Sequence, residues 1–282
     1  MDNHGLSLLL CTNGDEDSRP VLEYGVWLAG LLKTPVILLG IVEGRNDKTA
    51  VERMMEETSD VLRRADISYE VRIDDGKAPV VIARHAIAGN YLTLVGRMGR
   101  PAWRRAVQGR SFRRILERVA TPVLYVPEAR LRLNSMLICL GGLGYAASME
   151  QIGLYLARAS KARVTLLHVV EPITLDYPTA REVQNHWLDI LNTDTPQGRN
   201  LGEALEEVRK AGLEAEFKVR HGNIVHEIVE EARQGDYDLV GMGSAYSAHS
   251  LRHLYMPNVT AEVAETLECP IFTVRLGYEL ME

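Results

Sequence analysis

The amino-acid sequence predicts two α/β domains in tandem, each a doubly wound parallel sheet with helices on both faces. Three observations support this. Two stretches of the chain repeat in step, 128 residues apart, and apolar runs of strand length alternate with segments of helical periodicity. The predicted strands are also apolar on both sides rather than alternating. Such strands must be buried on both faces, which requires helices above and below the sheet.

The repeat indicates that a whole domain was duplicated. Residues 33–43 (KTPVILLGIVE) align with residues 161–171 (KARVTLLHVVE). Further along the chain, residues 121–123 (TPV) align with residues 269–271 (CPI), where the offset has grown to 148. A repeat of this length is a domain rather than one unit of a solenoid, and one copy of a domain can keep a site that the other loses.

We expect domain boundaries at residues 1–130 and 131–282, and both lengths lie in the usual range. The larger offset places about twenty additional residues in the second copy, at about residues 172–200. This insertion is either a plain surface loop or a lid or partner-binding arm that uses Tyr177 and Trp187.

The elements of the first copy follow from its apolar pattern. Ser18 is expected to cap the first helix, with Pro20 in the first turn, where a missing N–H costs little. In the second copy, Ser148 and Gln151 have the spacing of a capping box. Open parallel sheets bind ligands at the carboxyl ends of their strands, where the strand order reverses. For the first copy we expect strands at residues 6–10, 36–42, 69–73, 92–95 and 123–126, separated by four helices.

The composition excludes several classes of protein. A hydrophobic fraction of 46% and a charged fraction of 25% are those of an ordinary globular protein. The sequence shows no apolar run of the roughly 20 residues that a membrane span needs and no signal peptide at its start. A net charge of −6 argues against general nucleic-acid binding. The three cysteines, Cys11, Cys139 and Cys269, are expected to be small buried residues in a reducing cytoplasm.

A set of spaced glycines is the main candidate for a binding site. Gly96 and Gly99 follow a predicted buried strand, and Gly109 comes after nine further residues, followed by Arg110 and Ser111 at the start of a predicted helix. Glycine allows the backbone to approach a phosphate closely. A helix N-terminus directs free N–H groups and a partial positive charge at an anion. This arrangement therefore favours a phosphate-containing ligand.

With these motifs, the chain resembles a tandem universal stress protein. The nucleotide-binding motif of that family is G-x2-G-x9-G followed by Ser or Thr, and the first copy matches its three glycines. The second copy matches other family features at residues 166–170 (LLHVV), 221–223 (HGN) and 269–271 (CPI). The resemblance implies a Rossmann-like, adenine nucleotide alpha hydrolase-like fold with a five-stranded parallel sheet in each domain. It also implies pairing through the last strands, either within the chain or in a homodimer.

The resemblance further implies a cytoplasmic stress-response protein that binds ATP, AMP or ADP, with Mg²⁺ as an accompanying ion, and is non-catalytic or at most weakly hydrolytic. Where nucleotide-binding members carry an Asp at the end of the first strand, this chain has Thr12 and Asn13 in the first copy and Gly141 and Gly142 in the second. Pro257 replaces a motif glycine in the second copy, so we place the site in the first copy. The expected site comprises Thr12, Asn13 and Ile41 beside the nucleoside, Gly96, Gly99 and Gly109 beside the phosphates, Arg97 and Arg110 as phosphate partners, and the flanking Val95 and Ser111.

Other interpretations of the same residues stay open. Residues 96–118 contain eight arginines and one acid. They form a phosphate-binding segment, a solvated surface, or a site for an anionic macromolecule such as RNA. The last is not favoured, because only Trp103 and Phe112 offer stacking surfaces there. His249 and His253 have the spacing of two metal ligands on one helix face, or are polar loop residues that fill a lost nucleotide pocket.

Two alternative functions follow. One is a member of the family that binds no nucleotide and acts through contacts with an unidentified protein. The other is a slow ATP hydrolase, for which the acids nearest the glycine motif are Asp15, Glu16 and Asp17.

Overall fold

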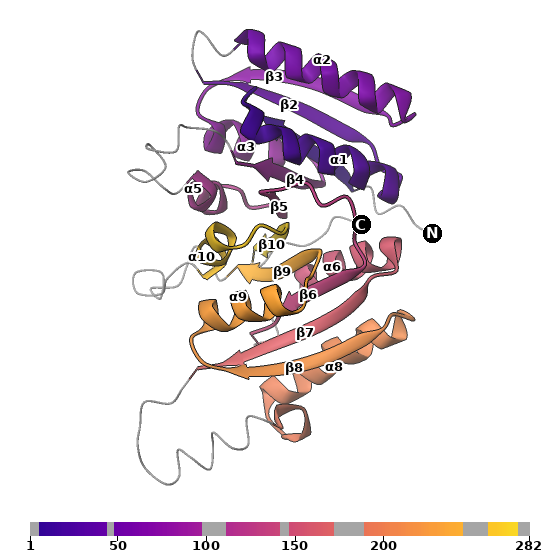
Figure 1. The fold of residues 1–282 in the computed structure, drawn as a ribbon, viewed down its shortest axis with the longest axis vertical. Coiled ribbons are helices and arrows are strands. Elements are labelled where there is room, and N and C mark those ends of the chain that lie inside the picture. The colour runs from indigo at the N-terminus through magenta and orange to yellow at the C-terminus, as the bar shows by residue number, and fades with distance from the viewer. Residues whose placement is uncertain are drawn as a thin grey trace. The chain divides into compact units, whose positions relative to one another are not determined.

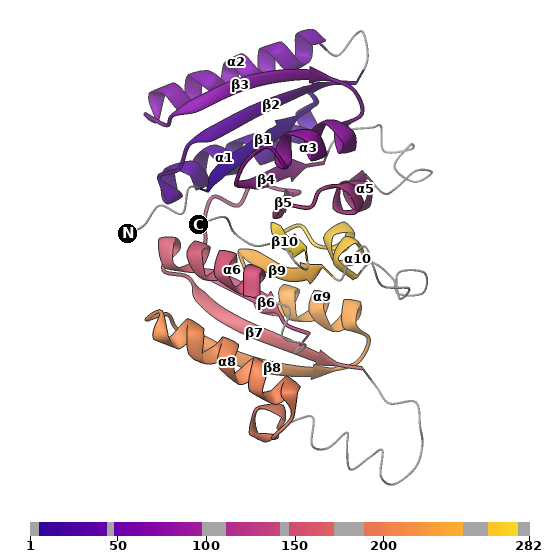
Figure 2. The same ribbon diagram turned by 180° about the vertical axis from the view of Figure 1, so that it is seen from behind.

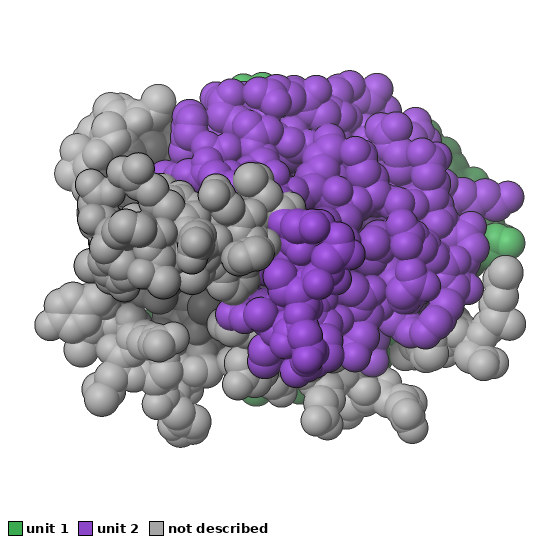
Figure 3. All heavy atoms as spheres, turned by 90° about the horizontal axis from the view of Figure 1, so that it is seen from below, with its two compact units in different colours: residues 1–131, 268–282 green, residues 132–267 purple. Residues whose placement is uncertain are grey.

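The computed structural model describes residues 6–43, 48–97, 111–141, 147–171, 189–244 and 259–275. The chain divides into two compact units, the first comprising Met1–Leu131 with Glu268–Glu282 and the second Arg132–Leu267 (Figure 3). The last strand of the second copy therefore belongs to the first unit. No helix in these described ranges is long and apolar enough to cross a membrane.

In unit 1 the strand order is β3-β2-β1-β4-β5-β10. The strands β1 to β5 are parallel, and β10 pairs antiparallel with β5, with Ile271 opposite Tyr125. The predicted pairing of the two last strands is thereby confirmed. Figures 1 and 2 show α1 and α2 on one face of this sheet and α3 and α5 on the other. The elements are β1 (Ser7–Thr12), η1 (Glu16–Ser18), α1 (Arg19–Leu32), β2 (Val36–Val42), α2 (Lys48–Arg64), β3 (Tyr69–Asp75), α3 (Ala78–Ala86), β4 (Tyr91–Gly96), α5 (Ser111–Arg118), β5 (Val123–Val126) and β10 (Ile271–Arg275).

Unit 2 has the same architecture, with parallel strands in the order β9-β6-β7-β8. The helices α6 and α8 lie on one face of the sheet and α9 and α10 on the other (Figures 1 and 2). The predicted doubly wound α/β fold is confirmed. The elements are β6 (Ser135–Cys139), α6 (Ala147–Ser160), β7 (Arg163–Val170), η2 (Ile190–Asn192), α8 (Pro196–Lys210), β8 (Ala215–His221), α9 (Ile224–Gln234), β9 (Leu239–Ser244) and α10 (Val259–Thr266).

The duplication extends to the backbone conformation. The first helix of each copy ends at a lysine in the left-handed region, Lys33 with φ 53° and Lys161 with φ 57°. After the third strand of each copy, Gly76 and Gly222 have φ of 138° and 151°, which only glycine adopts readily. Each of these glycines donates its N–H to the last carbonyl of the second strand in its own copy, at 3.0 and 3.1 Å. The two copies therefore share the turns that determine their topology.

The segment predicted as an insertion at about residues 172–200 ends before residue 200, because α8 already begins at Pro196. Pro196 and Gly198 fall within the range predicted for the insertion, but they belong to the first turn of α8. The hydroxyl of Thr195 caps this helix by accepting the N–H of Gly198 at 3.0 Å, and proline is tolerated in a first turn because its missing N–H would have no partner there. Residues 172–188, which include Tyr177 and Trp187, lie outside the described residues.

A buried carboxylate fixes the start of unit 2. The side chain of Asp238 is 2% exposed. Its Oδ2 accepts the backbone N–H of Asn134 at 2.7 Å and that of Ser135 at 3.2 Å, and its Oδ1 accepts from Nε of Arg132 at 2.6 Å. A buried charge is tolerated only when hydrogen bonds replace its hydration, and these three contacts do so.

We predict that Asp238→Asn lowers the stability of unit 2 by about 2–4 kcal/mol, because the amide cannot accept all three hydrogen bonds. Urea unfolding and amide hydrogen exchange of residues 132–140 would measure the loss. Asp236→Asn is the matched control, since Asp236 pairs with the same Arg132 at 3.0 Å but its side chain is 74% exposed. Equal effects of the two substitutions would contradict the prediction.

Candidate functional site

The candidate site lies at the carboxyl edge of the unit 1 sheet. There β1 is flanked by β2 and β4, so the strand order reverses at this point. Thr12 at the end of β1 pairs with Gly40 of β2, and Leu10 pairs with Leu94 two residues before Gly96 ends β4. The structure therefore brings the ends of all three strands to one edge, where doubly wound sheets bind ligands.

Thr12 faces the interior of the unit. It has no exposed surface, and its hydroxyl lies 2.7 Å from the hydroxyl of Ser18 and accepts the N–H of Gly14 at 3.1 Å. Ser18 was expected to cap α1, but its hydroxyl donates instead to the carbonyl of Asp15 at 2.6 Å and makes no cap hydrogen bond. Both hydroxyls thus hold the β1–α1 loop closed.

Gly14, which sequence reasoning did not single out, determines where this loop lies. It has φ of 78°, and a Cβ there would lie 2.5 Å from the backbone nitrogen of Val51 and 2.8 Å from the carbonyl carbon of Ala50. The loop is therefore packed directly on the backbone of α2. Asn13 is half-buried beside it, with its Oδ1 3.4 Å from the N–H of Asp15. The signal in the sequence was a glycine two residues after a buried strand.

The predicted residues at the ends of β2 and β4 have different environments. Ile41 and Val95 have no exposed surface and belong to the core beneath the edge. A Cβ on Gly96 would lie 2.9 Å from Cγ1 of Val21, so this glycine allows β4 to pack closely on α1. Arg97, the next residue, is half-buried and forms no ion pair with any described residue.

The rest of the glycine motif is described only at its end. Gly99, Gly109 and Arg110 lie outside the described residues, and Ser111 begins α5. This helix is anchored by Phe112, which is 5% exposed and stacks on Tyr125 with ring centroids 4.4 Å apart. Phe112 is therefore not available to stack on a base, contrary to the RNA interpretation of this segment. Trp103 lies outside the described residues.

The arginines of α5 have unequal surroundings. Arg113 pairs with Glu117 at 3.1 Å, whereas Arg114 and Arg118 are exposed and pair with no described acid. The basic character of this segment thus persists at the surface of α5.

Among the acids of the β1–α1 loop, Glu16 is engaged in surface ion pairs. Glu16 pairs with Arg19 at 2.7 Å and lies 3.8 Å from Arg53, and hydrogen bonding to Arg19 lowers the pKa of Glu16. Asp15 accepts the N–H of Asp17 at 3.5 Å. Within the described parts of the chain, no three His, Cys, Asp or Glu side chains are grouped so as to hold a metal ion.

Comparison with known proteins identifies the family. The sequence model of the universal stress protein family matches this chain twice, at residues 7–127 and 134–275. The chain belongs to the universal stress protein family. It is 24% identical over 306 aligned positions to the universal stress protein Slr1230 of Synechocystis, covering 95% of this chain and 99% of that protein. The universal stress protein YxiE of Bacillus subtilis matches half of the chain, with 26% identity over 147 residues and 99% of its own length covered.

A solved structure has the same fold over nearly the whole length. The crystal structure of a universal stress protein from Archaeoglobus fulgidus superimposes with a TM-score of 0.68 at 16% identity, covering 96% of both chains. The tandem organisation predicted from the repeat is confirmed by the paired family matches.

The corresponding edge of the second universal stress protein repeat differs in chemistry. Gly141 follows β6 and offers no side chain. His168 on β7 is 6% exposed, and its Nδ1 lies 2.8 Å from the carbonyl oxygen of Leu140. Burial lowers the pKa of His168, and the neighbouring His221 adds to this effect. A neutral imidazole therefore joins the ends of two strands. His249, His253 and Pro257 lie outside the described residues.

We predict that Gly14→Ala lowers the stability of unit 1 by about 2 kcal/mol or more, because a Cβ would be strained at this φ and would overlap the backbone of α2. The control is Gly30→Ala in α1, where nothing lies within 4 Å of the added Cβ and helix propensity is expected to give a gain of about 0.5–1 kcal/mol. Thermal unfolding of both variants would measure the difference, and similar shifts in Tm would contradict it.

We predict that His168 contributes to the pH dependence of stability. Its folded pKa lies below its ordinary value of 6.5, so its contribution is present above that value and is lost as the pH falls through the folded pKa. Ring-proton titration should give a pKa below 6.5. His168→Gln should flatten the decline of the urea midpoint between about pH 7.5 and about pH 5.5, whereas an unchanged decline would contradict this assignment.

Proposed function

We propose that this universal stress protein binds ATP, or the related nucleotides ADP or AMP, at the carboxyl edge of its first domain, residues 1–130, as a non-catalytic cytoplasmic stress-response protein. One observation carries the proposal. Arg97 comes directly after β4, at the point where the strand order reverses. Its guanidinium pairs with no described acid. A guanidinium in this position suits the planar, bidentate recognition of phosphate oxygens.

The glycine motif supports binding of the phosphates. Gly99 and Gly109 would let the backbone approach the phosphates, and Arg97 and Arg110 would pair with their charge. Ser111 begins α5, whose N-terminus supplies partial positive charge to an anion. Gly96 would act indirectly, because its missing side chain allows β4 to pack against Val21.

The nucleoside would lie over the end of β1. Asn13 is the side chain there with both exposure and hydrogen-bonding capacity, and Ile41 lies in the apolar core below. Thr12 would act through the loop, since its hydroxyl holds Ser18 and Gly14 in place rather than reaching outward. Asn13 would therefore make the polar contact with the nucleoside for which other members of the family use an acid.

The engagement of Glu16 near this edge supports a non-catalytic role. Glu16 is held by Arg19 and Arg53, so it is poorly placed to orient an attacking water. Mg²⁺ would arrive with the nucleotide, bound by its phosphates. None of the three cysteines forms a disulfide.

One observation favours a second candidate function. The buried, fully engaged hydroxyl of Thr12 leaves the end of β1 with fewer polar groups for a ligand, and Asp15 and Glu16 add exposed negative charge nearby. These features favour a protein that acts through contacts with other proteins. The edge of β5 is itself covered by β10, so a homodimer would have to use another surface.

Calorimetric titration with ATP tests the first proposal. We expect one site per chain, abolished in Gly109→Asp and weakened about tenfold in Arg97→Ala, because a charge-assisted phosphate contact is lost. Arg118→Ala removes the same kind of charge from the far end of α5, about 10 Å along the helix from Ser111, and is expected to have little effect.

Each outcome separates the candidates. No heat with ATP, ADP or AMP at about 1 mM would contradict nucleotide binding and favour the protein-contact function. Equal weakening by Arg97→Ala and Arg118→Ala would show that general charge, rather than a specific phosphate contact, attracts the nucleotide. Phosphate release that disappears on replacing Asp15 and Asp17 would contradict the non-catalytic role.

A further inference from the structure

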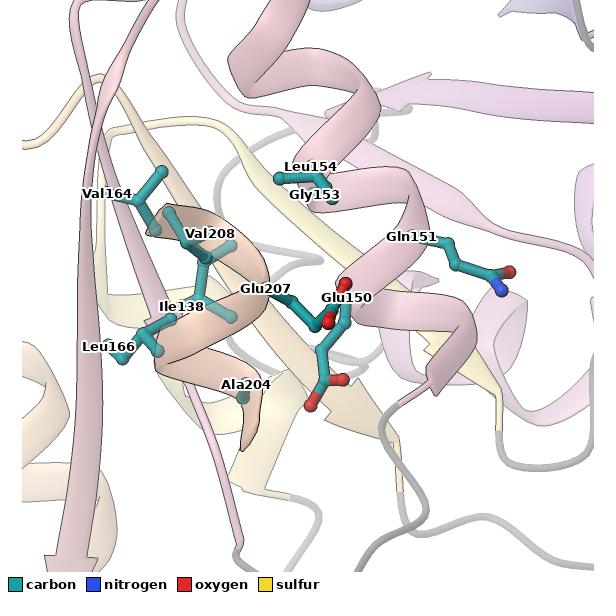
Figure 4. A pocket seen from close by; sticks show the side chains of 10 residues that line it. All are labelled: Ile138, Glu150, Gln151, Gly153, Leu154, Val164, Leu166, Ala204, Glu207 and Val208. Carbon is teal, nitrogen blue, oxygen red and sulfur yellow. The ribbon is translucent and has the colours of Figure 1, made fainter. Parts of the chain in front are cut away.

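Unit 2 contains a cavity of about 210 Å³ between α6 and α8, over the strands β6 and β7 (Figure 4). Its wall is apolar, with Ile138 and Leu166 from the sheet, Leu154 from α6 and Val208 from α8. A cavity of about 150 Å³ lined by similar residues is large enough to hold benzene. The volume here therefore suits a small organic molecule with an apolar body.

Two carboxylates line the same cavity from facing helices. Glu150 projects from α6 and Glu207 from α8, and Figure 4 shows both side chains extending into the space between these helices. Glu207 pairs with Lys210 at 3.0 Å, but Glu150 forms no ion pair or hydrogen bond with any described residue. Burial raises the pKa of Glu150, and the charges of Glu207 and Glu203 raise it further. The ionised form of Glu150 thus has no compensating cation among the described residues.

The fold itself does not require these acids. The position of Glu150 corresponds in the first copy to Leu22, 128 residues earlier, which is 3% exposed and packs in the core. Glu207 corresponds to Val61, at the same offset that relates Gly222 to Gly76. Two apolar residues of one copy are thus two acids in the other. Only the first exchange concerns a buried position, because Glu207 is 60% exposed and Val61 is 47% exposed. A half-buried carboxylate such as that of Glu150 is unfavourable unless a cation accompanies it.

We propose that this cavity binds a small organic ammonium ion with an apolar body. The apolar part lies on Ile138 and Leu166, and the ammonium group donates hydrogen bonds to Glu150 and Glu207. Charge complementarity selects the cation, because an anion is repelled by the same carboxylates. A bare Ca²⁺ or Mg²⁺ needs six or more oxygen ligands, which an apolar wall does not supply.

Benzylammonium is a suitable probe, and benzyl alcohol is its neutral analogue of nearly the same size. We expect benzylammonium to shift the amide resonances of α6 and α8 and to bind at least about tenfold more tightly than benzyl alcohol. Glu150→Gln, which keeps the volume, is expected to reduce benzylammonium affinity about tenfold. Glu206→Gln is the matched control on α8, since Glu206 is exposed and pairs with Arg209 at 2.9 Å.

A second variant distinguishes a loss of binding from a loss of folding. Glu150→Leu restores the residue of the first copy and is expected to keep or raise Tm while abolishing benzylammonium binding. The proposal is overturned if benzylammonium does not bind, if benzyl alcohol binds equally well, or if Glu150→Gln and Glu206→Gln have equal effects. Nucleotide titration of the same variants should be unchanged, because the cavity lies in the other unit.

Discussion

Burial of the first strand of each copy on both faces is the constraint on which the rest of the structure depends. In β1, Leu8, Leu9, Leu10 and Cys11 have no exposed surface. A strand of this kind must have neighbours on both edges and helices on both faces, so the chain must cross over after every strand. Those crossovers place the carboxyl ends of β1 and β4 side by side at one edge of the sheet. The candidate nucleotide site is therefore a consequence of how the core is buried.

Much of this fold could be predicted from the sequence, because positions that are buried on both faces of a sheet are occupied by apolar residues. Uninterrupted apolar runs indicated the strands, and the repeat indicated the second domain. The pairing of β5 with β10 was implied by the resemblance to the universal stress protein family. The presence of a Thr or Ser does not indicate which way its hydroxyl points or which group it bonds. Thr12 was expected to face a ligand and Ser18 to cap α1. Both hydroxyls instead form hydrogen bonds within the β1–α1 loop. Pro196 was misplaced for a related reason, since proline occurs both in loops and in the first turn of a helix.

The candidate sites show a sharper limit of sequence reasoning. The glycine spacing was visible because a motif has a fixed register, whereas the role of Gly14 depends on the approach of α2, which is distant in sequence. The cavity in unit 2 was missed because Glu150 and Glu207 occupy helix positions where an acid usually faces solvent. Only the packing of α6 beside α8 brings these two side chains together. Sequence pattern thus reveals sites formed within one segment better than sites formed between helices.

The two copies also show how a duplicated fold can diverge without loss of stability. Matched left-handed residues such as Lys33 and Lys161 keep the turns unchanged, so substitutions on the faces of the helices do not alter topology. The first copy keeps its apolar contact at Leu22 and its glycine motif, whereas the second has lost the motif and gained acids between its helices. Polar residues in such a position reduce packing energy, and they persist more readily when a ligand restores that energy. The divergence of the second copy is therefore more consistent with a changed ligand than with simple decay.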